Sequence, residues 1–351
     1  MGKSTLITIT KPFLLFTALL SLFTLPAAAQ PAKVELLPVN TCLAALDTMK
    51  AKNPYQWIAE VWNKEDSIFL EMQRPNRYLN RGDFTLLQNA VTGLTIPDRE
   101  LRAILPEWKA PDSLKGSIPV KCYAFDPPFN QYALVFGPTL EWSHQVFFFT
   151  GNQLVGVKEI FHKTGLEIRH FKNPQRETVV YITQCIESGT GIWQYNWFFF
   201  KYQSGQIVPV LNVLKESNKF LPGESRSFAY ESKFVAPSPF TLTADYEVLL
   251  PDLQSSPVRL RKMTENHAYT YSRENGELTR NKAAAALSAA QMTALHVYAR
   301  EELFIHAFAT HLKTALMEGN LRQKQAVQAL VSAFVQAHPE QFSGGIKAAN
   351  P

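Results

Sequence analysis

The chain has 351 residues and a formal charge of +5, and 46% of its residues are hydrophobic while 19% are charged. This composition excludes an intrinsically disordered protein, because disordered chains combine few apolar residues with a high net charge. Three Cys residues in this length are too few for a disulfide-stapled scaffold. The length predicts one large domain or two ordinary ones, with enough apolar residues for a substantial core.

Residues 1–29 have the pattern of a secretory signal peptide. Two lysines accompany the start of an uncharged apolar run, Pro12–Pro26, and Ala27–Ala29 supplies the small residues that signal peptidase requires. The run is about 15 residues long, whereas a helix needs roughly 20 to cross a bilayer. We therefore predict cleavage after Ala29 and a secreted or periplasmic bacterial protein, with an uncleaved membrane anchor as the alternative.

The mature chain gives no reason to expect nucleic acid as a partner or a membrane span. Removing Lys3 and Lys11 subtracts two positive charges, so the formal charge falls from +5 to +3. No dense run of Lys and Arg marks a surface for nucleic acid. No later segment approaches the length of apolar sequence that a spanning helix needs.

The region from 30 to 111 is predicted to be mainly helical. Asn53 and Pro54 suit the start of a helix, because Asn caps helices and Pro fits their first turn. Pro97-Asp98 begins a second, short helix that a further proline ends. Arg81-Gly82-Asp83 matches the integrin-binding tripeptide, and we interpret it as a chance match.

From 112 to 282 the apolar pattern changes to a period of two, which is typical of strands. No segment between the strands is long enough for a crossover helix, so consecutive strands should pair antiparallel, as a meander. The predicted strands are Val120–Phe125, Gln131–Phe136, Trp142–Phe149, Leu154–Phe161, Leu166–Phe171, Thr178–Gln184, Ile192–Tyr202, Ile207–Leu214, Ser227–Phe234, Phe240–Leu249, Val258–Met263 and His267–Tyr271.

One hairpin pattern recurs in this region. The aromatic run Val146–Phe149 is followed by Gly151-Asn152, and the run Trp197–Phe200 is followed by Ser204-Gly205, each with an aliphatic restart. Gly and Asn adopt the positive φ that tight hairpin turns require. A weaker third copy surrounds Asn275-Gly276, and the spacing is irregular, so we predict recurrent hairpins rather than a propeller. A small or partial propeller is the alternative.

Residues 283–340 predict a C-terminal helix hairpin. Phe304 and Phe308 begin an apolar stripe of helical spacing, and a capping box at Asn320 opens the second helix. The tail from 341 to 351 is expected to be disordered. Together these regions predict an α+β fold: an antiparallel β-meander, sandwich or partial barrel-like, with a helical N-terminal zone and a C-terminal helix hairpin.

Motifs for catalysis and metal binding do not occur. The serine nucleophile sequence Gly-x-Ser-x-Gly and the Gly-rich phosphate loops are absent. His306 and His311 are five residues apart, which places them about 140° apart around a helix, so they do not face one metal ion. We therefore predict no metal site and no cofactor.

Four polar residues, Asp126, Glu141, His144 and Glu187, lie near the ends of predicted strands. A glycoside hydrolase needs two carboxyl groups across one cleft, roughly 5–10 Å apart. If two of the four residues met in this way, the chain would be a secreted hydrolase that acts on a polysaccharide or another polymer.

The segment from 192 to 200 is the most unusual in the chain. Trp193, Tyr195 and Trp197 share one face of the predicted strand, and such an aromatic row is a platform for sugar rings or a flat apolar ligand. The alternative is a central strand whose aromatic residues fill the core. The sequence thus favours a non-enzymatic binding protein for an unidentified extracellular or envelope ligand, with these three residues as the candidate site.

Cys42, Cys122 and Cys185 are an odd set in a chain that is expected to be exported. Their spacing contains no C-x-x-C pair, which excludes the usual zinc and redox-dithiol patterns. We favour three buried free thiols, and one disulfide with a third free thiol is the alternative.

Overall fold

A computed structural model of the chain describes residues 34–53, 67–109, 116–138, 142–163, 165–189, 192–219, 227–237, 240–250, 258–269, 273–274, 277–278 and 301–342. All elements below belong to the unit Leu36–Pro351. The predicted signal peptide, the predicted helix after Asn53 and nearly all of the predicted tail lie outside the described residues.

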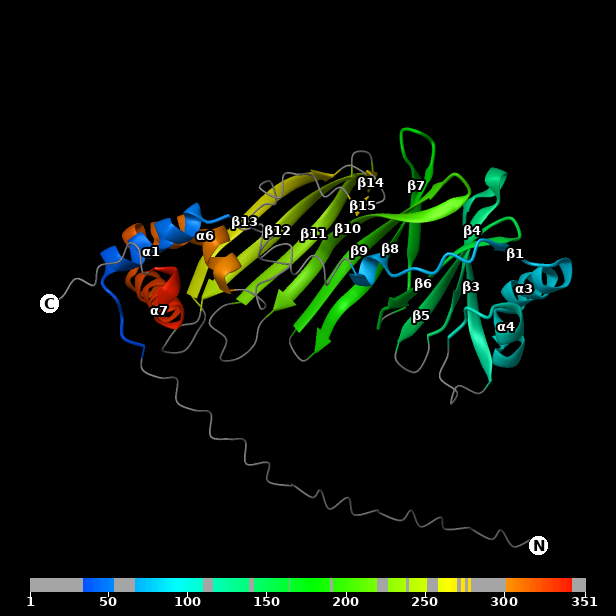
Figure 1. Cartoon of the computed structure of the whole chain (residues 1–351), viewed down its shortest axis with the longest axis horizontal. Coiled ribbons are helices and arrows are strands. Elements are labelled where there is room, and N and C mark those ends of the chain that lie inside the picture. The colour runs from blue at the N-terminus through cyan, green and yellow to red at the C-terminus, as the bar shows by residue number, and fades with distance from the viewer. Residues whose placement is uncertain are drawn as a thin grey trace, which may run out of the picture. The chain divides into compact units, whose positions relative to one another are not determined.

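The fold is α+β, and its strands form antiparallel meanders as predicted (Figure 1). The first sheet has six strands in the order β1-β6-β5-β4-β3-β2. Its strands are β1 (Arg77–Tyr78), β2 (Thr95–Pro97), β3 (Ser117–Asp126), β4 (Gln131–Phe136), β5 (Ser143–Thr150) and β6 (Gln153–Phe161).

The second sheet has seven strands in the order β13-β12-β11-β10-β9-β8-β7. Its strands are β7 (Ile168–Lys172), β8 (Thr178–Gly189), β9 (Ile192–Gln203), β10 (Gln206–Lys219), β11 (Ser227–Pro237), β12 (Phe240–Leu250) and β13 (Val258–Tyr269). The meander is therefore divided between β6 and β7, which belong to different sheets. A small hairpin, β14 (Arg273–Glu274) with β15 (Glu277–Leu278), follows β13.

The described helices lie toward both ends of the chain. They are α1 (Val39–Ala51), α3 (Arg81–Gly93), α4 (Asp98–Ile104), α6 (Glu301–Glu318) and α7 (Leu321–Ala337), with short 3-10 helices η1 (Pro127–Phe129) and η3 (Pro339–Gln341). The predicted helix at Pro97-Asp98 and the capping box at Asn320 are confirmed. The tripeptide at 81–83 opens α3, where the Asn80 side chain accepts a hydrogen bond from the Asp83 amide.

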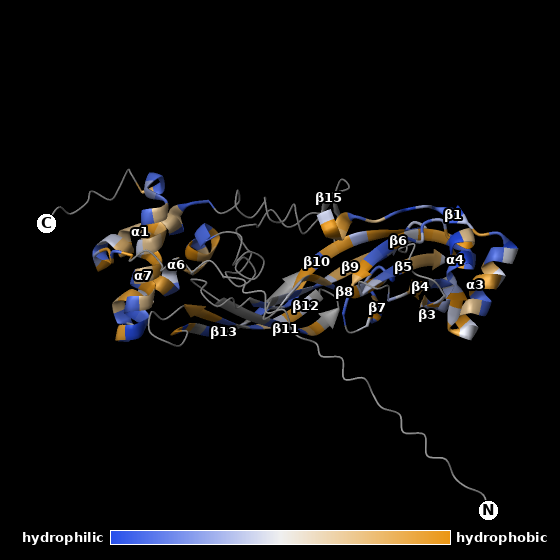
Figure 2. Ribbon diagram, turned by 90° about the horizontal axis from the view of Figure 1, so that it is seen from below, coloured by the Kyte–Doolittle hydropathy of each residue, from blue (hydrophilic) through white to orange (hydrophobic). Residues whose placement is uncertain are grey.

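Three apolar clusters connect these elements. The first joins α1, α6 and α7 to one face of the seven-stranded sheet, and the second joins the other face of that sheet to the six-stranded sheet. The third packs α3 and α4 on the far face of the six-stranded sheet. The hydropathy colouring in Figure 2 shows apolar residues on the helices α1, α6 and α7 and along β9 and β10.

The aromatic runs occupy strands with both faces buried. On β9, Trp197 and Phe199 belong to the first cluster, whereas Phe198 and Phe200 belong to the second. The run on β5 divides in the same way, with Phe148 in the second cluster and its two Phe neighbours in the third. Continuous aromatic sequence, rather than strict alternation, is the expected pattern for a strand covered on both sides.

The seven-stranded sheet curls strongly. Tyr181 of β8 stacks on Phe234 of β11 with ring centroids 5.7 Å apart, although β9 and β10 lie between their strands. Neighbouring strands are about 4.8 Å apart, so a flat sheet would place β8 and β11 about 14 Å apart. The rings can meet only because the face that carries them is concave.

Candidate functional site

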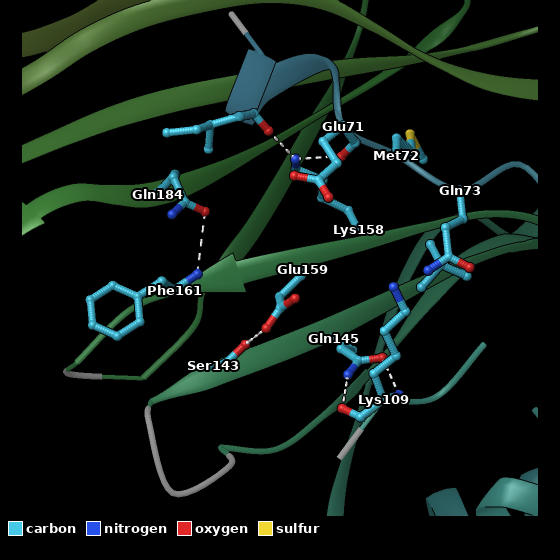
Figure 3. A pocket seen from close by; sticks show the side chains of 12 residues that line it. Glu71, Met72, Gln73, Lys109, Ser143, Gln145, Lys158, Glu159, Phe161 and Gln184 are labelled. Atoms are coloured by element: carbon cyan, nitrogen blue, oxygen red, sulfur yellow. Dashed lines mark hydrogen bonds between the residues drawn. The ribbon is translucent and has the colours of Figure 1, made fainter. Parts of the chain in front are cut away.

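A cavity of about 340 Å³ lies at one end of β6, between β5, β8 and the segment 67–73 (Figure 3). Ligand pockets in proteins are typically about 300–1,000 Å³. Carboxylate, carboxamide, lysine and serine side chains dominate its walls. These polar residues include Gln73, Ser143, Gln145, Lys158, Glu159 and Gln184.

The residues 67–78, which we call the edge segment, reach the outer edge of β6 and pair with it antiparallel at Gln73 and at Arg77–Tyr78. Arg77 lies opposite Leu154, and further back Gln73 forms a bridge with Val157. The next pairing position would place Glu71 opposite Glu159. Instead the edge segment is helical at residues 67–70, so the position opposite Glu159 is left open at the cavity.

The pairing pattern fixes the direction of the Glu159 backbone groups. Val157 exchanges two hydrogen bonds with Gln73, at 2.9 and 3.0 Å, so both its backbone groups point away from β5. In an antiparallel ladder the direction alternates residue by residue, so Glu159 and Phe161 point outward as well. The Phe161 amide confirms this, because it donates to the Gln184 side chain at 3.2 Å. On this outer edge the Glu159 N–H and C=O have no hydrogen-bond partner among the described residues, and Glu159 lines the cavity.

Two side chains hold the edge segment in its turned-away course. Phe69 is fully buried between the sheets, with its ring 4.9 Å from that of Phe198. Lys158 is 3% exposed, and its Nζ donates to the carbonyl oxygens of Ile68 and, at 2.6 Å, of Glu71. These carbonyls end the helical turn and would otherwise lack donors, so Lys158 acts as an internal helix cap.

Burial lowers the pKa of Lys158 from its usual 10.5 to about 8, although the carboxylates of Glu71 and Glu159 act in the opposite direction. Desolvation outweighs these two charges because Lys158 is almost completely enclosed. A neutral amine still has two N–H groups, which are enough for the two carbonyl oxygens that it caps.

The remaining walls of the cavity are fixed by hydrogen bonds. Ser143 donates to the Glu159 carboxylate, and the Gln145 carboxamide exchanges two hydrogen bonds with the backbone of Lys109. Gln184 accepts from the Phe161 amide and donates to the carbonyl of its own neighbour in β8. The polar groups of the walls are therefore held in place before any ligand arrives.

The structure does not arrange the predicted aromatic row as an open platform. Trp197 is 7% exposed and belongs to the core, so the alternative interpretation as a central strand holds for it. Tyr195 is half-buried, and its ring lies 5.4 Å from that of His162. Trp193 is 38% exposed. The side chains become progressively buried along this face of β9, so Trp193 is the most exposed of the three.

Of the four polar residues considered for hydrolysis, the two whose side chains the structure describes, Asp126 and His144, lie far apart. Asp126 is buried and paired with Lys172. In the ladder it lies beside Gln131, which pairs with Thr150 at one end of β5, whereas His144 lies at the other end of β5, about 20 Å away along the strand. Glu141 lies outside the described residues, and for Glu187 only the backbone is described.

His144 has an unusual environment of its own. It is 4% exposed, its side chain is hydrogen-bonded to the backbone of His162, and its Nε2 has no partner among the described residues. Burial holds the pKa of His144 below its usual value, and that of His162 is lowered for the same reason. Both rings are therefore held in the neutral form near pH 7.

The thiols differ in part from expectation. All three Cys are free, but Cys122 is exposed, so the expectation of three buried thiols is wrong for this residue. The alternation of buried and exposed positions in β3 stops after Val120, and Lys121 and Cys122 are both exposed. His306 is hydrogen-bonded through Nδ1 to the carbonyl of Met49 at 2.9 Å.

Comparison with known proteins gives no relative: no protein-family model, curated protein or solved structure matches the chain. In the described ranges, no helix is both long and apolar enough to cross a bilayer. Nor does this part of the chain bring together a metal-binding set of His, Cys, Asp and Glu side chains. The candidate site therefore depends on its geometry alone.

Proposed function

We propose that the chain is a non-enzymatic binding protein, secreted or periplasmic, that holds its ligand in the cavity at the end of β6. One observation carries this proposal: the open backbone groups of Glu159 lie in a cavity whose polar walls are already fixed. A site that is ordered before binding pays less entropy when the ligand enters. The signal-peptide pattern supports the proposed compartment.

The cavity suits a polar ligand of modest size. Carboxamide and carboxylate groups such as those of Gln73 and Glu159 offer both donors and acceptors, and Met72 and Phe161 offer apolar contact. Concave sites with a few placed polar groups usually bind small molecules or short segments of larger ones.

The proposal is tested by blocking the cavity. Gln73 is exposed at the cavity, and Gln206 is exposed on β10 outside it, so Gln73→Trp and Gln206→Trp are a matched pair. The mature protein and both variants are titrated with short peptides and with neutral oligosaccharides by calorimetry. We expect at least one class to bind the mature protein and Gln206→Trp but not Gln73→Trp. Binding that Gln73→Trp leaves unchanged, or no binding of either class, would overturn the proposal.

A polymer hydrolase is the second candidate, and one observation favours it. Two carboxylates, Glu71 and Glu159, line the same cavity (Figure 3). A pair of carboxyl groups is the usual equipment for cleaving glycosidic bonds. Release of reducing ends from polysaccharides by the mature protein, lost in Glu159→Gln, would replace the binding role with catalysis.

A further inference from the structure

We propose that the cavity binds an extended peptide, one residue of which pairs with the open backbone of Glu159 as an added piece of edge strand. This inference rests on the proposed function, because it names the ligand class of the same site.

The unpaired part of the β6 edge, which we call the vacancy, is one residue long and consists of Glu159. On one side Val157 is paired with Gln73 through a backbone bridge, and on the other the Phe161 amide donates a hydrogen bond to the Gln184 side chain. Between them the N–H and C=O of a single residue have no partner in the part of the chain that the structure describes, on the same edge of β6. Strand addition to an exposed edge is a general mode of peptide recognition, in which main-chain hydrogen bonds supply the affinity.

Backbone geometry favours a peptide over an N-acetylated sugar. In a trans amide the N–H and C=O point in opposite directions, so one acetamido group cannot meet both groups of Glu159. An amino-acid residue in the extended conformation presents its own N–H and its own C=O on one edge, and a pair of such residues exchanges both hydrogen bonds. A residue between two peptide groups therefore satisfies both open groups of Glu159, which a single acetamido group does not.

The Lys158 cap keeps the vacancy open. If the edge segment continued as a strand, Glu71 would take the position opposite Glu159 and close it. Lys158 instead binds the carbonyl oxygens of Ile68 and Glu71, and Phe69 anchors the turn in the core. These buried contacts thus keep the edge segment out of the position that an incoming peptide would take.

The side chain of Glu159 predicts the charge of the paired residue. A residue directly opposite Glu159 would have its side chain beside the Glu159 carboxylate, and opposite charges across a strand pair are favourable. We therefore expect Lys or Arg at the central position of the peptide, with about two- to fivefold tighter binding than for Glu at that position.

The test removes the hydrogen bonds one partner at a time. The probe is acetyl-Ala-Ala-Lys-Ala-Ala-amide, and its matched control carries a methyl group on the lysine backbone nitrogen. We expect the methyl group to weaken binding by at least about tenfold, since it removes the donor to the Glu159 carbonyl and blocks close approach. Equal binding of the two peptides would overturn the proposal.

Two substitutions in the protein separate the backbone from the side chain. Glu159→Pro removes the outward N–H, whereas Glu159→Ala removes the side chain and keeps the N–H. Because this N–H does not belong to the ladder with β5, an edge position of this kind tolerates proline. Glu159→Ala should bind within about fivefold of the mature protein, and Glu159→Pro should bind more weakly than Glu159→Ala. If Glu159→Pro fails to fold, the comparison of the methylated and unmethylated peptides tests the proposal by itself.

The outcomes separate this inference from the proposed function. If oligosaccharides bind and Gln73→Trp abolishes this binding, the binding role stands and the peptide proposal is overturned. Peptide binding that Gln73→Trp leaves unchanged would overturn both, since the ligand would then lie elsewhere.

Discussion

The Nζ of Lys158 donates a hydrogen bond to the carbonyl oxygen of Glu71 at 2.6 Å, at the point where the edge segment leaves β6. The two residues are 87 positions apart in sequence. This contact and its companion at Ile68 determine that residues 67–70 form a helical turn rather than more strand. The cavity therefore depends on one buried lysine.

Replacing this lysine should loosen the edge segment. In Lys158→Met the carbonyl oxygens of Ile68 and Glu71 lose their donor, and an unsatisfied buried acceptor costs about 1–3 kcal/mol. We expect faster cleavage after Glu71 by a glutamate-specific protease under native conditions. Lys50→Met, at an exposed position of α1, is the control and should leave the rate unchanged. Equal cleavage rates in the two variants would contradict the capping role.

The lowered pKa of Lys158 predicts a pH dependence of stability. The native chain releases this proton near pH 8, whereas the unfolded chain holds it until about pH 10.5. Between these values the unfolded state binds more protons, so the contribution of Lys158 to the free energy of unfolding rises with pH. The measurement is urea denaturation of the mature protein and of Lys158→Met at several pH values.

The difference between the two proteins isolates Lys158 from the other groups that titrate in this range. We expect the mature protein to gain stability relative to Lys158→Met from about pH 8 to about pH 10.5. A difference that stays constant or shrinks across this window would show that the amine is not desolvated in the folded state.

Gly156 lies where β6 meets the edge segment. A Cβ at this position would overlap the Met72 methyl group and a methyl group of Ile207. Overpacking of this kind costs about 1–3 kcal/mol, so Gly156→Ala should lower the midpoint of urea denaturation. Gly189→Ala has open space around it and serves as the control. Similar midpoints for the two variants would contradict the close packing of the edge segment on β6.

Two tryptophans on one face of β9 should differ in their contribution to stability. Trp197 is 7% exposed in the core, and truncation of a buried Trp costs about 3–5 kcal/mol. Trp193 is 38% exposed, so Trp193→Ala should cost much less than Trp197→Ala. Chemical denaturation of both variants measures the difference. Comparable losses would mean that Trp193 is as enclosed as Trp197.

Local sequence pattern was sufficient to predict most strands but not their grouping. β4 matches its predicted range, because its apolar run has clear turn residues on both sides. The division into two sheets between β6 and β7 could not be predicted, since it depends on which distant strands pair. Two predicted strands, Val258–Met263 and His267–Tyr271, proved to be the single strand β13. Thr264 and Asn266, which lie between the two predicted ranges, are exposed side chains of the continuous strand.

The candidate site was missed for a related reason. Lys158 lies on the same face of β6 as Gly156 and Ile160, and Ile160 is fully buried. A lysine on this buried face was the one indication in the sequence of an inward-facing charge. Its partners at Ile68 and Glu71 are distant in sequence and contribute only backbone atoms. No side-chain motif could have revealed them. The aromatic row, by contrast, was conspicuous in the sequence, but its Trp197 belongs to the core.

Amide hydrogen exchange at Glu159 tests the central claim most directly. NMR would compare this amide with that of Val157, which is bonded to Gln73, in the free protein and with saturating peptide. The open edge predicts fast exchange at Glu159 and slow exchange at Val157 in the free protein, and protection of Glu159 when the peptide binds. Protection of Glu159 equal to that of Val157 before any ligand is added would contradict the vacancy on which the site depends.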